Sequence, residues 1–124
     1  MAGKRKFIKR ALDLASNSEH SNFKHGAVVV CGGKILSEGR NTYLSRRATQ
    51  RDASYSTHAE ENALRNLMFR KPLKPGTVMY VARWATYGPA MSKPCARCEK
   101  SLKLAGIRRV GYSTAGGQVD FIQL

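Results

Sequence analysis

The sequence is poor in cysteine and in acidic residues, and it has no long apolar run. None of its apolar segments approaches the ~20 residues that span a membrane. The basic N-terminus is not followed by the apolar core of a signal peptide. The three cysteines are an odd number, which argues against a disulfide framework and fits metal ligation in a reducing compartment. We therefore expect an intracellular, cytoplasmic protein with no membrane partner.

The scarcity of acidic residues gives the chain a strong positive charge. Eight Asp and Glu stand against 22 Lys and Arg, so the formal net charge is +14. A field this positive favours anionic partners, meaning phosphate-bearing substrates or nucleic acid, and it allows a single-stranded nucleic acid to bind through the basic surface. The alternative, that the excess of Lys and Arg only keeps a small protein soluble, stays open.

The hydrophobic pattern predicts one α/β domain that covers residues 1–124. Apolar spacings of three and four predict helices, and short β-branched runs predict strands. The expected helices are 4–16, 57–70 and 95–105, and the expected strands are 26–31, 34–40, 77–84, 107–112 and 119–124. Residues 41–57 and 85–93 are expected to be loops. This order predicts layers of helices around a mixed sheet of about five strands.

Some finer expectations follow from individual residues. The turn Gly32-Gly33 should join the first two strands as an antiparallel hairpin. Thr57 is a candidate N-cap for the second helix. The third helix should make its apolar contacts through Leu102, Leu104 and Ala105. Since a parallel crossover needs a dozen or more residues and only a few separate the last two strands, the last strand should be antiparallel.

Two short motifs carry the chemistry. His58-Ala59-Glu60 offers an imidazole and, two residues on, a carboxylate, and Pro94-Cys95-Ala96-Arg97-Cys98 offers two thiols at the spacing that binds one metal ion. With His58, Cys95 and Cys98 as ligands, a zinc ion keeps a fourth position open for water, which is typical of a catalytic site. Both motifs lie at helix starts that should meet at one end of the sheet.

The carboxylate of Glu60 suits a proton shuttle beside the metal, and Glu61 points about 100° away around the helix. Such a site suits hydrolytic attack on an sp² carbon that bears an amino group. The alternative is a closed structural zinc site in which Cys31 is the fourth ligand, although Cys31 is expected to be a buried residue at the far end of a strand.

The two motifs together resemble the signature of the zinc-dependent cytidine and deoxycytidylate deaminase superfamily. The resemblance covers nearly the whole chain and implies a three-layer α/β/α fold and one catalytic Zn²⁺ per chain. It implies that His58, Cys95 and Cys98 hold the zinc and that Glu60 shuttles the proton. It further implies that Asn41, the backbone N–H of Ala59, and Ser92 or Lys93 contact the substrate.

The substrate implied by the resemblance is a cytosine nucleoside or nucleotide such as dCMP, which would be deaminated to its uracil counterpart. One alternative is a deaminase of cytosine or adenine in single-stranded DNA or RNA, and a weaker one is a non-catalytic zinc-fold protein that binds nucleic acid. The family's signals are mixed, because an antiparallel last strand resembles the free-cytidine branch and the ligand His58 resembles the nucleotide and polynucleotide branches. We also expect a homo-oligomer, in which neighbouring subunits cover the exposed sheet edge.

Overall fold

The computed structural model describes residues 2–18, 24–43, 56–57, 59–67, 73 and 76–124. Its elements in chain order are α1 (Ala2–Ser16), β1 (Lys24–Cys31), β2 (Lys34–Arg40), β3 (Thr42–Tyr43), β4 (Ser56–Thr57), α2 (Ala59–Arg65), β5 (Val78–Ala85), β6 (Gly88–Ala90), α3 (Ala96–Ala105), β7 (Arg109–Ser113) and β8 (Val119–Gln123). None of the helices in these residues has the length and apolar character that a membrane crossing needs.

The main sheet has six strands and is mixed. Its order is β2-β1-β5-β7-β8, and β6 pairs with the end of β5. The β5–β7 pair is parallel and is connected through α3, whereas β1–β2, β1–β5, β5–β6 and β7–β8 are antiparallel. The antiparallel last strand is thus confirmed, and the sheet has one strand more than expected.

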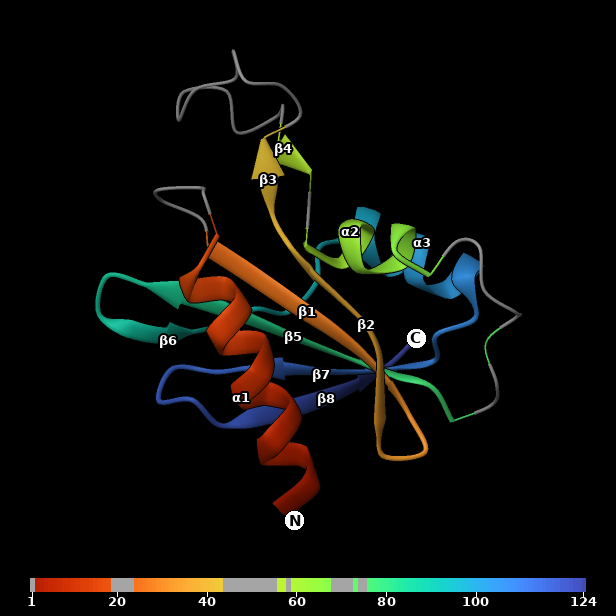
Figure 1. Cartoon of the computed structure of the whole chain (residues 1–124), viewed down its shortest axis with the longest axis horizontal. Coiled ribbons are helices and arrows are strands. Elements are labelled where there is room, and N and C mark those ends of the chain that lie inside the picture. The colour runs from red at the N-terminus through yellow and green to blue at the C-terminus, as the bar shows by residue number, and fades with distance from the viewer. Residues whose placement is uncertain (1, 19–23, 44–55, 58, 68–72, 74–75) are drawn as a thin grey trace.

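Helices cover both faces of this sheet, which confirms the three-layer α/β/α fold. Helix α1 lies on one face, and α2 and α3 lie side by side on the other (Figure 1). Because side chains alternate along a strand, Val28 and Tyr80 pack under α1, while Val29 and Val81 pack under α2 and α3. Burial on both faces explains why these strands read as continuous apolar runs.

Two glycines on the paired strands β1 and β2 allow the helices to approach closely. A Cβ on Gly26 would lie 2.2 Å from the backbone oxygen of Ala11 in α1, and one on Gly39 would lie 2.4 Å from the backbone nitrogen of Ala63 in α2. These separations are shorter than any side chain permits, so only glycine fits at either position. Gly39 therefore determines how closely the first turns of α2 pack on the sheet.

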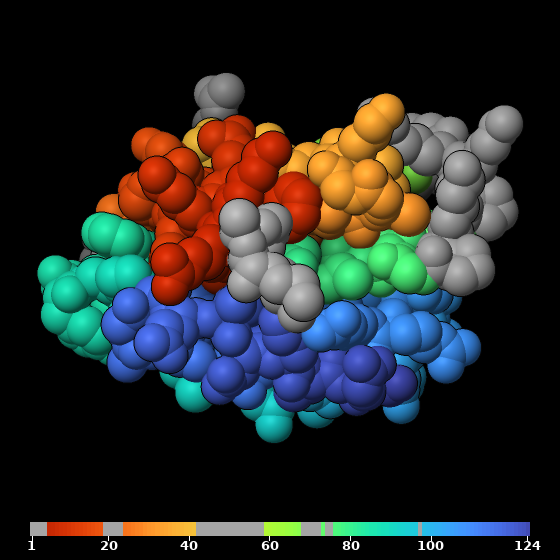
Figure 2. Space-filling model, turned by 90° about the horizontal axis from the view of Figure 1, so that it is seen from below, coloured from red at the N-terminus to blue at the C-terminus, as the bar shows by residue number. Residues whose placement is uncertain are grey.

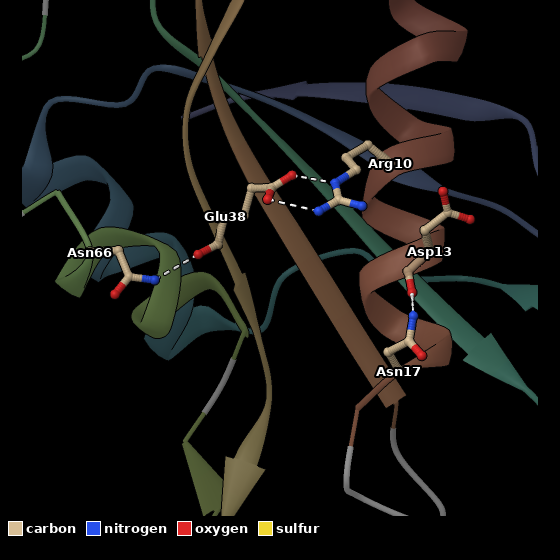
Figure 3. Close-up of polar contacts among 5 residues, drawn as sticks. All are labelled: Arg10, Asp13, Asn17, Glu38 and Asn66. Carbon is tan, nitrogen blue, oxygen red and sulfur yellow. Dashed lines mark hydrogen bonds and ion pairs between the residues drawn. The ribbon is translucent and has the colours of Figure 1, made fainter.

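Polar contacts hold β2 between the two helix layers (Figure 3). The guanidinium of Arg10 in α1 pairs with both carboxylate oxygens of Glu38. The side-chain amide of Asn66, just after α2, donates to the backbone oxygen of the same Glu38 at 2.7 Å. Hydrogen bonding to Arg10 lowers the pKa of Glu38, and the same hydrogen bond raises the pKa of Arg10. Glu38 thereby connects both helix layers to the outer strand.

Several details of the sequence reading are wrong. Helix α2 ends at Arg65, and Leu67 bonds back to Leu64 in a tight turn; the rest of the expected helix lies outside the described residues. The expected loop 85–93 contains the strand β6. Leu104 is 81% exposed, and Ala105 is exposed as well, so of the three expected contacts only Leu102 reaches the core.

Two further expectations need correction at the loop 41–57 and at Cys31. The ends of that loop pair as the short strands β3 and β4, and Thr57 lies in β4; residues 44–55 are outside the described part. Cys31 is half-buried at the end of β1 and next to the Gly32-Gly33 hairpin turn, at the opposite end of the strand from the two motifs. The hairpin itself is confirmed, with positive φ at both glycines.

Candidate active site

The catalytic carboxylate predicted from the sequence lies in the first turn of α2. Glu60 is only 5% exposed, and Ala59 beside it is fully buried. The helix begins at the carboxyl end of β2 and runs back along that strand. Asn62 in its first turns donates its side-chain amide to the backbone oxygen of Arg40, the last residue of β2, at 2.6 Å. Glu60 is therefore held at the end of the sheet where β2, β5 and β7 finish.

The two thiols come from the start of α3. Cys95 is the N-cap residue and is exposed, and Cys98 is buried in the first turn. Burial raises the pKa of the Cys98 thiol, and the charge and hydrogen bonding of the Glu60 carboxylate raise it further, followed by those of Cys95. The structure therefore brings Glu60, Cys95 and Cys98 together from two helices, although α2 and α3 are far apart in the sequence.

The residues at this place fit a zinc ion. Two sulfurs three residues apart at a helix start are a normal pair of zinc ligands. A buried thiol next to a carboxylate stays protonated unless a cation compensates the negative charge, and a divalent metal supplies that compensation. The third expected ligand, His58, lies outside the described residues, and no group of three His, Cys, Asp or Glu side chains placed to hold a metal is found within them.

Ser92 and Ser113 fix the segment that leads into α3, and the sequence reading missed the second of them. On one side of β5 the strand β7 pairs as far as Val81, and β6 pairs from Arg83 onward. The two hydroxyls fill the gap: Ser92 donates to the backbone oxygen of Val81 at 2.8 Å, and Ser113 accepts the N–H of Arg83 at 3.1 Å.

The same two serines also bond to each other's segment. The N–H of Ser92 donates to the backbone oxygen of Ser113 at 3.0 Å, and the N–H of Ser113 donates to the hydroxyl of Ser92 at 2.8 Å. The hydroxyl of Ser113 donates to the backbone oxygen of Ala90 at 2.6 Å. Both side chains are almost fully buried. We call this network the serine clamp; it holds the chain two residues before Pro94 on the carboxyl end of the parallel strand pair.

The remaining predicted substrate contacts lie around the same end of the sheet. Asn41 is buried after β2, where its side-chain oxygen accepts the N–H of His25 at 2.9 Å and lies 2.5 Å from the hydroxyl of Ser18. Its side-chain oxygen is thus used within the protein. Lys93 is exposed beside Cys95, whereas the hydroxyl of Ser92 belongs to the serine clamp.

Comparison with known proteins shows the family. The model of the cytidine and deoxycytidylate deaminase zinc-binding region matches residues 1–114. The chain belongs to this deaminase family. Membership implies hydrolytic deamination and, for the family as a whole, a zinc-binding region. A comparison with curated proteins by sequence gave no match.

Solved deaminases share the fold. A dCMP deaminase from the cyanophage S-TIM5 is 27% identical and has a TM-score of 0.71, covering 90% of this chain and 82% of its own. A guanine deaminase from Bacillus subtilis is 25% identical with a TM-score of 0.57, covering 88% of this chain and 62% of its own. A cytidine deaminase from Mycobacterium tuberculosis, at 19% identity and a TM-score of 0.57, covers 89% of this chain and 84% of its own, and it shows the common fold alone.

Proposed function

We propose that this deaminase hydrolyses the exocyclic amine of cytosine in a nucleoside or nucleotide such as dCMP, giving the uracil product and ammonia. The observation that carries the proposal is the meeting of the buried Glu60 carboxylate with the Cys98 thiol at one end of the sheet. The dCMP deaminase from the cyanophage S-TIM5 is 27% identical to this chain in its apo structure. It has also been solved in complex with dCMP and dUMP, and the identity for that structure is 26%. The +14 charge favours a substrate that bears a phosphate.

The proposal includes one zinc ion, held by His58, Cys95 and Cys98. Cys95 and Cys98 lie at the positive end of the α3 dipole, which stabilises thiolates and complements the ion. When bound, the ion supplies the Lewis acidity that makes a water molecule nucleophilic near neutral pH.

Glu60 would carry the protons. Its carboxylate takes one proton from the attacking water and passes it to the ring nitrogen N3. It then takes the second proton from the same oxygen and passes it to the departing amine. One water is consumed and one ammonia is released for each uracil formed, so atoms and charge balance. Burial of Glu60 beside Cys98 keeps bulk water away from this transfer.

Binding groups are proposed around that carboxylate. The N–H of Ala59 belongs to the first turn of α2, where backbone donors have no partner within the helix, and it would donate to a carbonyl of the base. Asn41 would contact the sugar or the base. Ser92 and Lys93 would border the departing amine, with Ser92 contributing through its backbone because its hydroxyl is held in the serine clamp.

An activity assay tests the proposal. Purified protein is given cytidine, dCMP and a cytosine-containing single-stranded oligonucleotide, with Glu60→Ala as the control and the zinc content measured for both. We expect dCMP to be turned over fastest, about one zinc per chain in both proteins, and loss of at least a hundredfold in rate for Glu60→Ala. Turnover of the oligonucleotide alone would show that the substrate is a single-stranded nucleic acid and not a free nucleotide. Activity that survives in Glu60→Ala would overturn the mechanism.

We also propose that the protein is a homo-oligomer, because β2 and β8 leave both edges of the main sheet uncovered by another strand in the described part of the chain. Light scattering after gel filtration at low salt should give a multiple of 13.7 kDa. A monomeric mass would contradict this.

A further inference from the structure

The face of the sheet opposite the candidate active site carries a groove that the deaminase reaction does not use. The groove has a volume of about 690 Å³ and runs between α1 and the turn that joins β7 to β8. Figure 2 shows α1 in red and the C-terminal strand in blue on one side of the molecule. Since α2 and α3 lie on the other face of the sheet, a single nucleotide could not occupy the groove and reach Glu60 at the same time.

The groove is lined by basic and apolar residues. Arg5 and Lys9 line it from α1, four residues apart and therefore on adjacent turns of one helix face. Four apolar side chains also line it: Ile8, Leu12, Val119 and Phe121. The remaining lining is the turn at Gly116, Gly117 and Gln118, so none of the described residues that line the groove is acidic.

An aromatic surface adjoins the groove at the β5–β6 hairpin. A Cβ on Gly117 would lie 3.5 Å from the ring of Pro89, so the hairpin borders the turn that lines the groove. Trp84 pairs in register with Pro89 and follows Tyr80 and Ala82 at intervals of two residues, which places it on the same α1 face as these two. Trp84 is 36% exposed and Tyr87, at the hairpin turn, is 75% exposed.

We propose that this groove and hairpin bind single-stranded nucleic acid. Proteins that bind single strands combine a basic groove, which follows the phosphates, with aromatic side chains on which bases stack. Here Arg5 and Lys9 supply the cations, and Trp84 and Tyr87 supply the stacking surfaces. The large apolar residues of α1, Phe7 and Ile8, are buried against the sheet, so the helix has no apolar face with which to enter a lipid surface.

Binding of labelled oligo(dT) measured by fluorescence anisotropy tests this inference separately from the proposed reaction. Thymine has no exocyclic amine, so the probe binds without being a substrate, and failure of the deaminase assay would leave the result unchanged. We compare Arg5→Glu/Lys9→Glu with Lys100→Glu/Lys103→Glu, which makes the same change in charge at exposed positions of α3 on the other face. Circular dichroism establishes that every variant is folded.

We expect the α1 variant to lose at least tenfold in affinity and the α3 variant less than threefold. Loss of two phosphate contacts should also make the slope of log affinity against log salt shallower by about 1.4. Tyr87→Ala should lose about fivefold or more through stacking. Equal losses in the two charge variants, tighter binding to a duplex, or preferential binding to phosphatidylserine vesicles would each overturn the proposal.

Discussion

The serine clamp yields the most direct test of how the structure positions the candidate site. Substitution of Ser113→Ala removes a hydroxyl that is fully buried but leaves the Cβ in place, so the packing volume hardly changes. Two backbone groups each lose a hydrogen bond: the oxygen of Ala90, at 2.6 Å, and the N–H of Arg83, at 3.1 Å. A hydrogen bond of this kind contributes about 0.5–1.5 kcal/mol to stability.

We therefore expect Ser113→Ala to lower the free energy of unfolding by about 1–3 kcal/mol, compared with the 5–15 kcal/mol typical of a small domain. Urea unfolding followed by the fluorescence of the single tryptophan measures it. The matched control is Ser16→Ala, since Ser16 is exposed and its hydroxyl donates to the backbone oxygen of Asp13 at 2.8 Å. That control should cost less than about 0.5 kcal/mol. Equal losses in the two variants would refute the reasoning.

A second measurement separates positioning from stability. Because the clamp holds the chain just before Pro94 and Cys95, Ser113→Ala should bind zinc more weakly and turn over substrate more slowly under conditions where it is fully folded. Competition with a chelator reports the zinc affinity without reference to activity. If zinc affinity and kcat are unchanged while stability falls, the clamp stabilises the sheet without positioning the thiols.

Two further predictions concern β2. Arg10 lowers the pKa of Glu38, so the pair stabilises the fold above the ordinary value of 4.5, and the contribution is lost as pH falls through the lowered pKa. In urea titrations Glu38→Gln should therefore cost about 0.5 kcal/mol at pH 7 and progressively less as the pH falls below 4.5. A cost that does not depend on pH would contradict the ion pair. Gly39→Ala should cost about 3 kcal/mol or more by thermal unfolding because its Cβ overlaps the backbone of Ala63, whereas Gly32→Ala, with open space around it, should cost about 1 kcal/mol through its positive φ alone.

The layers of the fold could be predicted from the sequence because they depend on periodic burial. Val28 and Val29 face opposite layers, and both are fully buried, so the unbroken apolar run correctly indicated a central strand. The turn Gly32-Gly33 and the C-cap Gly106, which has a φ of 96°, mark positions where the backbone needs a left-handed conformation. These signals are local, and local signals are what a sequence displays.

The errors arise where tertiary contacts decide. The sequence Gly88-Pro89-Ala90 has no strand-forming residue, and it becomes β6 because the extended end of β5 offers it a partner. Leu104 follows Leu102 by two residues and so lies about 200° around α3, away from the core that Leu102 fills. Leu67 is buried as its spacing predicts, although the chain there is a turn and no longer a helix. Ser113 gave no signal, since a serine at a strand end is common.

The structure positions the two motifs of the candidate site by different physical means. Glu60 is placed by steric contact, because Gly39 lets α2 rest directly on β2. Cys95 and Cys98 are placed by hydrogen bonds, because the serine clamp fixes where the chain leaves the sheet. A motif states which groups react, but the relative position of its halves depends on contacts such as these. The two motifs, His58 to Glu60 and Cys95 to Cys98, therefore predict the chemistry. Gly39 and Ser113 decide whether the carboxylate and the thiols come together.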